Sequence, residues 1–126
     1  MYKQGGSMMY QFICYTKCGT CRKAKKWLEE NNIPFEERPI KENNPTENEL
    51  REWIKKSGYP LKRFFNTSGT LYKEMNLKDK LKEMSEEEQI KLLSTDGMLV
   101  KRPLLIGGET VLVGFKEEEW NNSLKK

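Results

Sequence analysis

Hydrophobic and polar positions follow different periods in successive parts of the chain, and these periods predict its elements. Residues 10–15 form an aromatic and β-branched run, which is typical of a strand. Apolar side chains then recur at spacings of three and four, at Cys21, Ala24 and Leu28, as on one face of a helix. A second strand is expected within residues 33–40. The first forty residues therefore predict a strand–helix–strand unit.

The middle of the chain has the pattern of several helices. Thr46 with Glu49, and Ser85 with Glu88, have the spacing of a capping box, in which the two side chains satisfy backbone N–H groups at a helix start. We expect a helix after each of these pairs and shorter helical turns between them. Asp96-Gly97 is the expected stop of the second helix.

The last part of the chain returns to strands. Residues 104–106 and 110–113 flank a Gly-Gly-Glu turn and predict a hairpin, and residues 115–124 predict a final helix. The predicted fold class is α/β, a thioredoxin-like fold with a helical insertion between the βαβ and ββα halves. We expect a single domain over residues 8–126, with the insertion at about 45–98. Residues 1–7 are Gly-rich and polar, as in a disordered tag or leader.

Composition limits the classes of function. The 126 residues include 23 Lys and Arg against 19 Asp and Glu, a net charge of +4. The lysines at 23, 25 and 26 are accompanied by Glu29 and Glu30, a mixed charge typical of a solvated helix face, so no direct DNA binding is expected. No apolar run is long enough to span a membrane, and no secretory signal is recognised, so a cytoplasmic location is expected. The absence of histidine excludes Ser–His and Cys–His nucleophiles.

The sequence Cys18-Gly-Thr-Cys21 beside a βαβ pattern is typical of thiol–disulfide chemistry. Cys18 falls at the predicted helix start, where free N–H groups favour an anion, and Lys17 and Arg22 add positive charge. We therefore expect Cys18 to attack as a thiolate. Cys21 lies on the apolar face and is expected to resolve the mixed disulfide. The alternative is that both are ordinary small residues near a helix start.

Cys14 raises the alternative of a metal site, because Cys14, Cys18 and Cys21 have a C-x3-C-x2-C spacing. A tetrahedral zinc site would lack its fourth Cys or His ligand, so no metal is expected. Cys14 alternates with Phe12 in the first strand, where a buried, inert thiol is the usual role. Arg102-Pro103 is a further candidate: Pro103 could begin an edge strand, or it could be cis and shape a substrate site in which Arg102 binds an anion.

Residues 15–28 (YTKCGTCRKAKKWL), together with Arg102-Pro103, Val-Gly-Phe at 113–115 and Phe-Phe-Asn-Thr-Ser-Gly at 64–69, resemble the arsenate reductase/Spx/MgsR family. The resemblance covers residues 8–124 and is nearest to a Cys-Gly-Thr-Cys branch. It implies a thiol-dependent reduction with Cys18 as nucleophile and Arg102 at the substrate. Glutathione, glutaredoxin or thioredoxin is then the expected reductant, and no bound cofactor is expected.

Departures from the family pattern bear on arsenate. Residues 64–66 lack an arginine that the reductases place there, and Gly114 falls near the place of another. Because an oxyanion is usually held by several charged donors, one matched arginine gives weak support for arsenate as the substrate. Spx-like members instead sense oxidation through such a cysteine pair and bind the C-terminal domain of the RNA polymerase α subunit. This redox-sensing regulator is the alternative to an enzyme.

Overall fold

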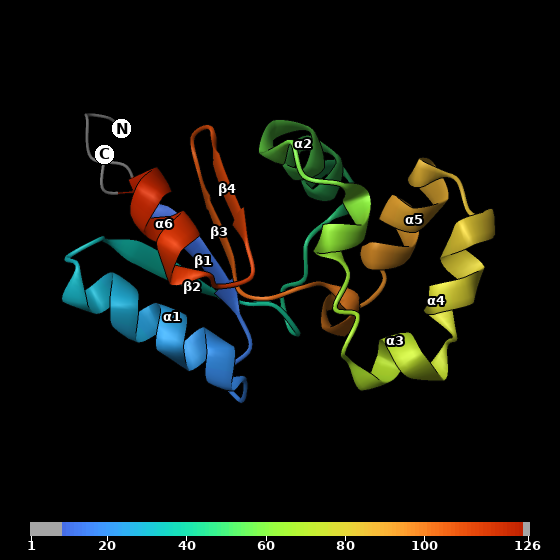
Figure 1. Cartoon of the computed structure of the whole chain (residues 1–126), viewed down its shortest axis with the longest axis horizontal. Helices are drawn as coiled ribbons and strands as arrows, with labels where there is room; N and C mark the ends of the chain where they lie inside the picture. Colours follow the sequence, from blue (N-terminus) through green and yellow to red (C-terminus); the bar gives the residue numbers. More distant parts are fainter. Residues whose placement is uncertain (1–8, 125–126) are drawn as a thin grey trace. The chain divides into compact units, whose positions relative to one another are not determined.

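The computed structural model describes residues 9–124, which divide into two compact units (Figure 1). Within these residues, one unit contains 9–39 and 102–124, and the other is Ile40–Lys101. The expected leader at residues 1–7 lies outside the described residues, and the single domain over 8–126 stays a prediction. Across the described chain, no helix is both long and apolar enough to cross a membrane.

The first unit is built on a mixed sheet. Its strands are β1 (Tyr10–Cys14), β2 (Phe35–Pro39), β3 (Leu104–Gly107) and β4 (Thr110–Val113), in the order β2-β1-β3-β4. Helix α1 (Gly19–Glu30) connects the parallel pair β1 and β2, while β3 is antiparallel to both β1 and β4. The predicted strand–helix–strand unit and the later hairpin are thus confirmed, and they share one sheet.

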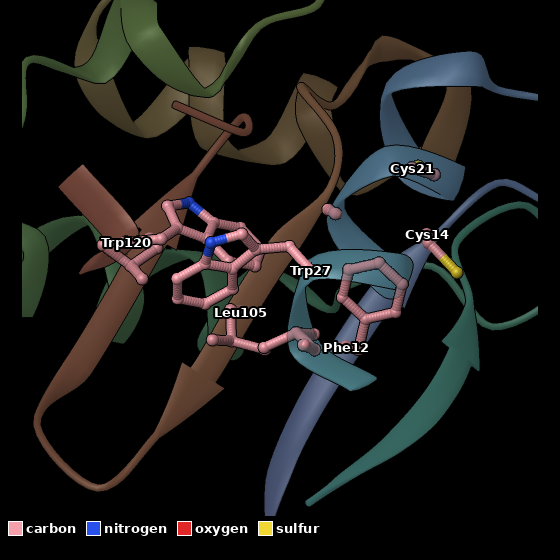
Figure 2. Close-up of a cluster of buried hydrophobic side chains, with 9 residues drawn as sticks. Phe12, Cys14, Cys21, Trp27, Leu105 and Trp120 are labelled. Carbon is pink, nitrogen blue, oxygen red and sulfur yellow. The ribbon is translucent and has the colours of Figure 1, made fainter. Parts of the chain in front are cut away.

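Helices α1 and α6 (Glu117–Leu124) pack on the same face of this sheet. Figure 2 shows the core between them, in which Trp27 of α1 and Trp120 of α6 approach edge to face, with ring centroids 6.1 Å apart. The buried members of this core are Phe12, Cys14, Cys21, Ala24, Trp27, Leu28, Leu105, Leu112 and Trp120. The core therefore includes two of the three cysteines, one from a strand and one from a helix.

Helix α6 begins later than the sequence predicts. Its first residue is Glu117, so the prediction of a helix from Phe115 is wrong at that end. Lys116 accepts the first helical hydrogen bond, from the Trp120 N–H to its carbonyl at 3.1 Å. Phe115 stands outside the helix and packs against Trp120, with ring centroids 4.9 Å apart. This contact is a hydrophobic staple, which fixes the entry into the helix from outside it.

The second unit consists of short helices. In chain order they are α2 (Glu47–Ser57), η1 (Leu61–Phe64), α3 (Thr70–Glu74), α4 (Leu77–Lys80), η2 (Leu81–Glu83), α5 (Glu86–Leu93) and η3 (Gly97–Leu99). Both predicted capping boxes are present, at Thr46 before α2 and at Ser85 before α5. Gly58 ends α2 in the left-handed conformation, with φ of 72°. The helices α2 and α5 of the insertion therefore begin where the sequence predicts.

The stop of α5 differs from the prediction. The helix ends at Leu93 rather than at Asp96-Gly97, because the hydroxyls of Ser94 and Thr95 donate to carbonyls of its last turn, each at 2.6 Å. The Asp96 carboxylate accepts a hydrogen bond from the Met98 N–H at 2.9 Å and starts η3 instead. Asp96 thus begins the next helical turn rather than ending the previous helix.

Candidate active site

Cys18 is the N-cap residue of α1. Its backbone is extended, and its N–H donates to the Tyr15 carbonyl at 2.9 Å, which fixes the turn that leads into the helix. The side chain is half-buried and makes no capping hydrogen bond to the helix. A thiolate at this position faces the unpaired N–H groups and the positive end of the helix dipole. Lys17 and Arg22 are exposed on either side, and their stabilising role stays a prediction.

Cys21 lies one turn further along α1 and is only 2% exposed. The Tyr15 N–H donates to its Sγ at 3.3 Å, and the Cys18 thiol also donates to this sulfur. A hydrogen bond from the Cys21 thiol to Cys14, together with burial, raises the pKa of Cys21 above its ordinary value. The structure thus places the half-buried thiol and the buried thiol in contact, at the predicted positions.

Cys14 ends β1 and is 4% exposed. The sequence predicts a buried, inert thiol here, and the structure confirms the burial but places Cys14 in a hydrogen bond with Cys21. The bond donated by the Cys21 thiol lowers the pKa of Cys14, against the opposing effects of burial and of Glu37. Figure 2 shows the two side chains at one end of the core, Cys14 from β1 and Cys21 from α1.

Arg102 and Pro103 lie directly before β3, and the peptide bond between them is cis. The Arg102 guanidinium carbon is 5.2 Å from the centre of the Tyr15 ring. The Nε and Nη1 atoms of Arg102 are buried and have no hydrogen-bond partner among the described residues. Buried donors of a charged side chain are usually paired, so these atoms are candidates to bind an anionic group.

The loop of Pro103 is tied to the end of β4. The Gly114 N–H donates to the Pro103 carbonyl at 2.8 Å, and the Gly114 carbonyl accepts from the Trp120 indole at 3.0 Å. Gly114 has φ of 74°, a left-handed conformation that favours glycine. The Val-Gly-Phe motif at 113–115 therefore positions the Arg102-Pro103 loop, which explains a glycine at that place.

Tyr15 connects the predicted site residues, and sequence reasoning gave it no role. Its N–H contacts the Cys21 sulfur, its carbonyl accepts from Cys18, and its ring lies beside the Arg102 guanidinium. The ring contact joins residues far apart in the sequence and leaves no local signal. Cys14 could have been predicted as a site residue, because alternation along the strand puts it on the sheet face that the helix covers with its Cys21 side. Within residues 9–124, no three possible ligands are grouped to hold a metal ion.

The family model described as the ArsC family matches residues 14–123, from the last residue of β1 into α6. The chain belongs to the ArsC family. The relatives of this ArsC-family chain include regulators as well as proteins described as reductases. The family therefore includes proteins with different recorded roles.

Among curated proteins, the chain is 55% identical to the uncharacterized protein YusI of Bacillus subtilis, over 92% of this chain and 98% of that protein. It is 30% identical to the regulatory protein MgsR of Bacillus subtilis, with 91% and 90% covered. It is also 30% identical to the global transcriptional regulator Spx 2 of Bacillus anthracis, with 85% and 82% covered. The predicted relation to Spx and MgsR is thus confirmed.

Among solved structures, an ArsC family related protein from Bacteroides fragilis has a TM-score of 0.89 and 56% identity, with 93% of this chain and 98% of that chain covered. A possible arsenate reductase from Streptococcus mutans UA159 has a TM-score of 0.83 and 41% identity, with 90% and 98% covered. These likenesses confirm the thioredoxin-like fold with its helical insertion.

Proposed function

We propose that this chain is a thiol–disulfide oxidoreductase in which Cys18 attacks and Cys21 resolves. The observation that carries the proposal is the pairing of a half-buried thiol at a helix N-cap with a buried thiol one turn away. An attacking thiol needs access to its substrate, whereas a resolving thiol needs only to lie beside the first. The two positions differ in this way.

The proposed reaction has two exchange steps. The Cys18 thiolate attacks one sulfur of a substrate disulfide, a bond from Cys18 to that sulfur forms, and the other sulfur leaves as a thiolate. Cys21 then loses its proton and attacks the Cys18 sulfur, so the Cys18–Cys21 bond forms and the second substrate sulfur leaves. Glutathione, glutaredoxin or thioredoxin would reduce the pair again. All three cysteines are free in this structure, which is the form that starts the cycle.

Arg102 is proposed to bind an anionic group of the substrate beside this pair. Its unpartnered buried Nε and Nη1 atoms support this role, and Tyr15 links it to both cysteines. A carboxylate of glutathione and an oxyanion such as arsenate share the chemistry that would recognise these donors. The resemblance to a possible arsenate reductase at 41% identity keeps arsenate as one candidate.

The test is turnover of a small disulfide, with glutathione as the reductant. We expect Cys18→Ser to abolish turnover and Cys21→Ala to accumulate a mixed disulfide on Cys18. Lys23→Ala, on the exposed side of α1, serves as the matched control and should keep wild-type turnover. Equal turnover by Cys18→Ser and wild type would contradict the proposal. Turnover with arsenate, glutathione and glutaredoxin, lost in Cys18→Ser, would identify arsenate as a substrate.

The second candidate is a redox-sensing regulator that binds the C-terminal domain of the RNA polymerase α subunit. The relatives named Spx 2 and MgsR, each 30% identical, favour it. A pull-down with that domain, run on the reduced and the oxidised chain, tests it, and absence of binding in both states would exclude it. A cytoplasmic location is proposed for either function, because a reactive thiol pair is kept reduced between cycles in that compartment.

A further inference from the structure

Cys21 has two sulfur neighbours rather than one. The Cys18 thiol donates a hydrogen bond to the Cys21 sulfur, and the Cys21 thiol donates one to the Cys14 sulfur. Cys14 and Cys21 are 4% and 2% exposed, whereas Cys18 is half-buried. The three thiols therefore lie near one another at the start of α1, and Cys21 interacts with both of the others.

The backbone brings the Cys21 sulfur close to Cys14. The Tyr15 nitrogen, which donates to Cys21 Sγ at 3.3 Å, follows Cys14 directly in the chain. Standard covalent geometry puts that nitrogen about 2.4 Å from the Cys14 Cα, so Cys21 Sγ lies within about 6 Å of this Cα. Cys14 and Cys21 are also buried in the same core cluster.

We propose that Cys14 is a third redox thiol of the site, and that the oxidised chain holds Cys21 in a disulfide with either Cys18 or Cys14. This inference rests on the proposed function, which supplies the Cys18–Cys21 disulfide. The Cys14 thiolate attacks the Cys21 sulfur, the Cys14–Cys21 bond forms, and the Cys18–Cys21 bond breaks. Its electron pair stays on Cys18, which leaves as a thiolate. The chain keeps the same oxidation state throughout the exchange.

The position of the Cys21 sulfur beside Cys14 in the shared core supports Cys14 as the attacking group, because thiol–disulfide exchange needs the attacking thiol within reach of the disulfide. The exchange moves the disulfide from the half-buried pair to the buried pair. Cys18 is thereby returned to its reduced form while two oxidising equivalents remain in the core. The half-buried thiol could then react with a second disulfide, such as oxidised glutathione, before any reductant acts.

A buried cysteine that only fills space is the competing interpretation of Cys14, since a free cysteine can serve as a small apolar residue. The two interpretations differ for a chain that lacks Cys18. A space-filling Cys14 stays a thiol under mild oxidation. A redox Cys14 forms a bond with Cys21 without help from Cys18.

The experiment oxidises the full-length Cys18→Ser variant with oxidised glutathione, blocks free thiols with N-ethylmaleimide in acid, and digests with trypsin. Cleavage after Lys17 and Arg22 puts Cys14 on peptide 4–17 and Cys21 on peptide 18–22. We expect an intact mass lower by two hydrogens and a link between these peptides. Two free thiols, or glutathione on Cys14 or Cys21 without a link, would overturn the proposal.

Two further measurements complete the test. Cys21→Ala, which keeps Cys14 and Cys18, is the matched control, and we expect at least tenfold less linked peptide because these two sulfurs share no hydrogen bond with each other. If Cys18→Ser does not fold by circular dichroism, the oxidised wild type decides. A Cys14–Cys21 link, located by fragmentation of the joined peptides 4–17 and 18–22, supports the proposal, whereas a Cys14–Cys18 link or a disulfide confined to peptide 18–22 overturns it.

The outcomes separate this inference from the proposed function. In Cys14→Ala, the Cys18–Cys21 bond must still form if the proposed function holds. A disulfide in Cys14→Ala but none in Cys18→Ser removes only the role of Cys14. If folded Cys14→Ala forms no disulfide and the wild type shows no turnover of the small disulfide, the proposed function itself is removed.

Discussion

Arg102→Met tests whether the unpartnered guanidinium serves a ligand or the fold. The change removes the buried Nε and Nη1 donors and keeps an unbranched side chain beside the Tyr15 ring. A buried donor without a partner costs about 1–3 kcal/mol, and a cation over an aromatic ring contributes about 0.5–2 kcal/mol. A methionine sulfur beside a ring restores about 0.3–1.5 kcal/mol. We therefore expect the free energy of unfolding to stay equal or to rise by about 1 kcal/mol.

The stabilisation that an anion gives should decrease in Arg102→Met, whereas the stability without anion should not. An anion at one hundred times its dissociation constant stabilises the wild type by about 2.7 kcal/mol. For a chain of this size, that corresponds to a rise in Tm of about 10 °C. In Arg102→Met we expect most of this rise to be lost. The variant would thus be at least as stable as the wild type without anion and less stable with it.

The assay is urea and thermal unfolding of the reduced protein in chloride, sulfate and arsenate at equal ionic strength. Arg38→Met is the matched control, because Arg38 also has a side-chain contact within the first unit, to the Gln11 amide oxygen at 3.1 Å. Its response to anions should equal that of the wild type. The reasoning is refuted if Arg102→Met loses more than about 1 kcal/mol in chloride, or if its anion-induced rise in Tm equals that of the wild type.

The remaining predictions concern the thiols and two glycines. The pKa of Cys21 is raised in the folded chain, so above about pH 9 the folded chain holds more protons than the unfolded chain. The free energy of unfolding of the wild type should therefore fall as the pH rises above about 9. Urea titrations of Cys21→Ala should not show that fall. The lowered pKa of Cys14 acts below that pH, where stability should rise with pH in the wild type and not in Cys14→Ala. Gly97→Ala should lose about 1–3 kcal/mol in the same assay, since its Cβ would collide with a backbone carbonyl, whereas Gly19→Ala meets no atom within 4 Å and should stay within about 1 kcal/mol of wild type. Iodoacetamide should label Cys18 first in the reduced protein, because it is the least buried thiol, and equal labelling of all three would contradict its assignment.

Local signals in the sequence were enough to predict most of the fold. The capping boxes at Thr46 and Ser85 are formed by residues three positions apart, so the letters alone carry the geometry. The same holds for α1, whose apolar face repeats at helical spacing. The prediction was wrong at the end of α5 and at the start of α6. At α5, hydroxyls donate hydrogen bonds to nearby carbonyls, and at α6 two aromatic rings pack together, and each boundary shifts by a few residues.

The site was predictable only in part. The phase of α1 places Cys18 at the cap and Cys21 in the core, and this follows from spacing. The contact of Cys14 with Cys21 depends on how β1 packs on α1. The stacking of Arg102 on Tyr15 joins the two chain segments that make up the first unit. Such contacts arise from tertiary packing, which a pattern of single letters does not specify.

The most direct test of the central claim is a glutathione redox titration of the Cys14→Ala variant, which retains only the proposed catalytic pair. Samples are equilibrated across a range of ratios of reduced to oxidised glutathione, quenched in acid and alkylated, and their masses are measured by mass spectrometry. We predict one reversible two-electron transition, with about 30 mV per tenfold change in the ratio of disulfide to dithiol and the bond inside peptide 18–22. Glutathione on Cys18 with a free Cys21 thiol at every ratio would contradict the account.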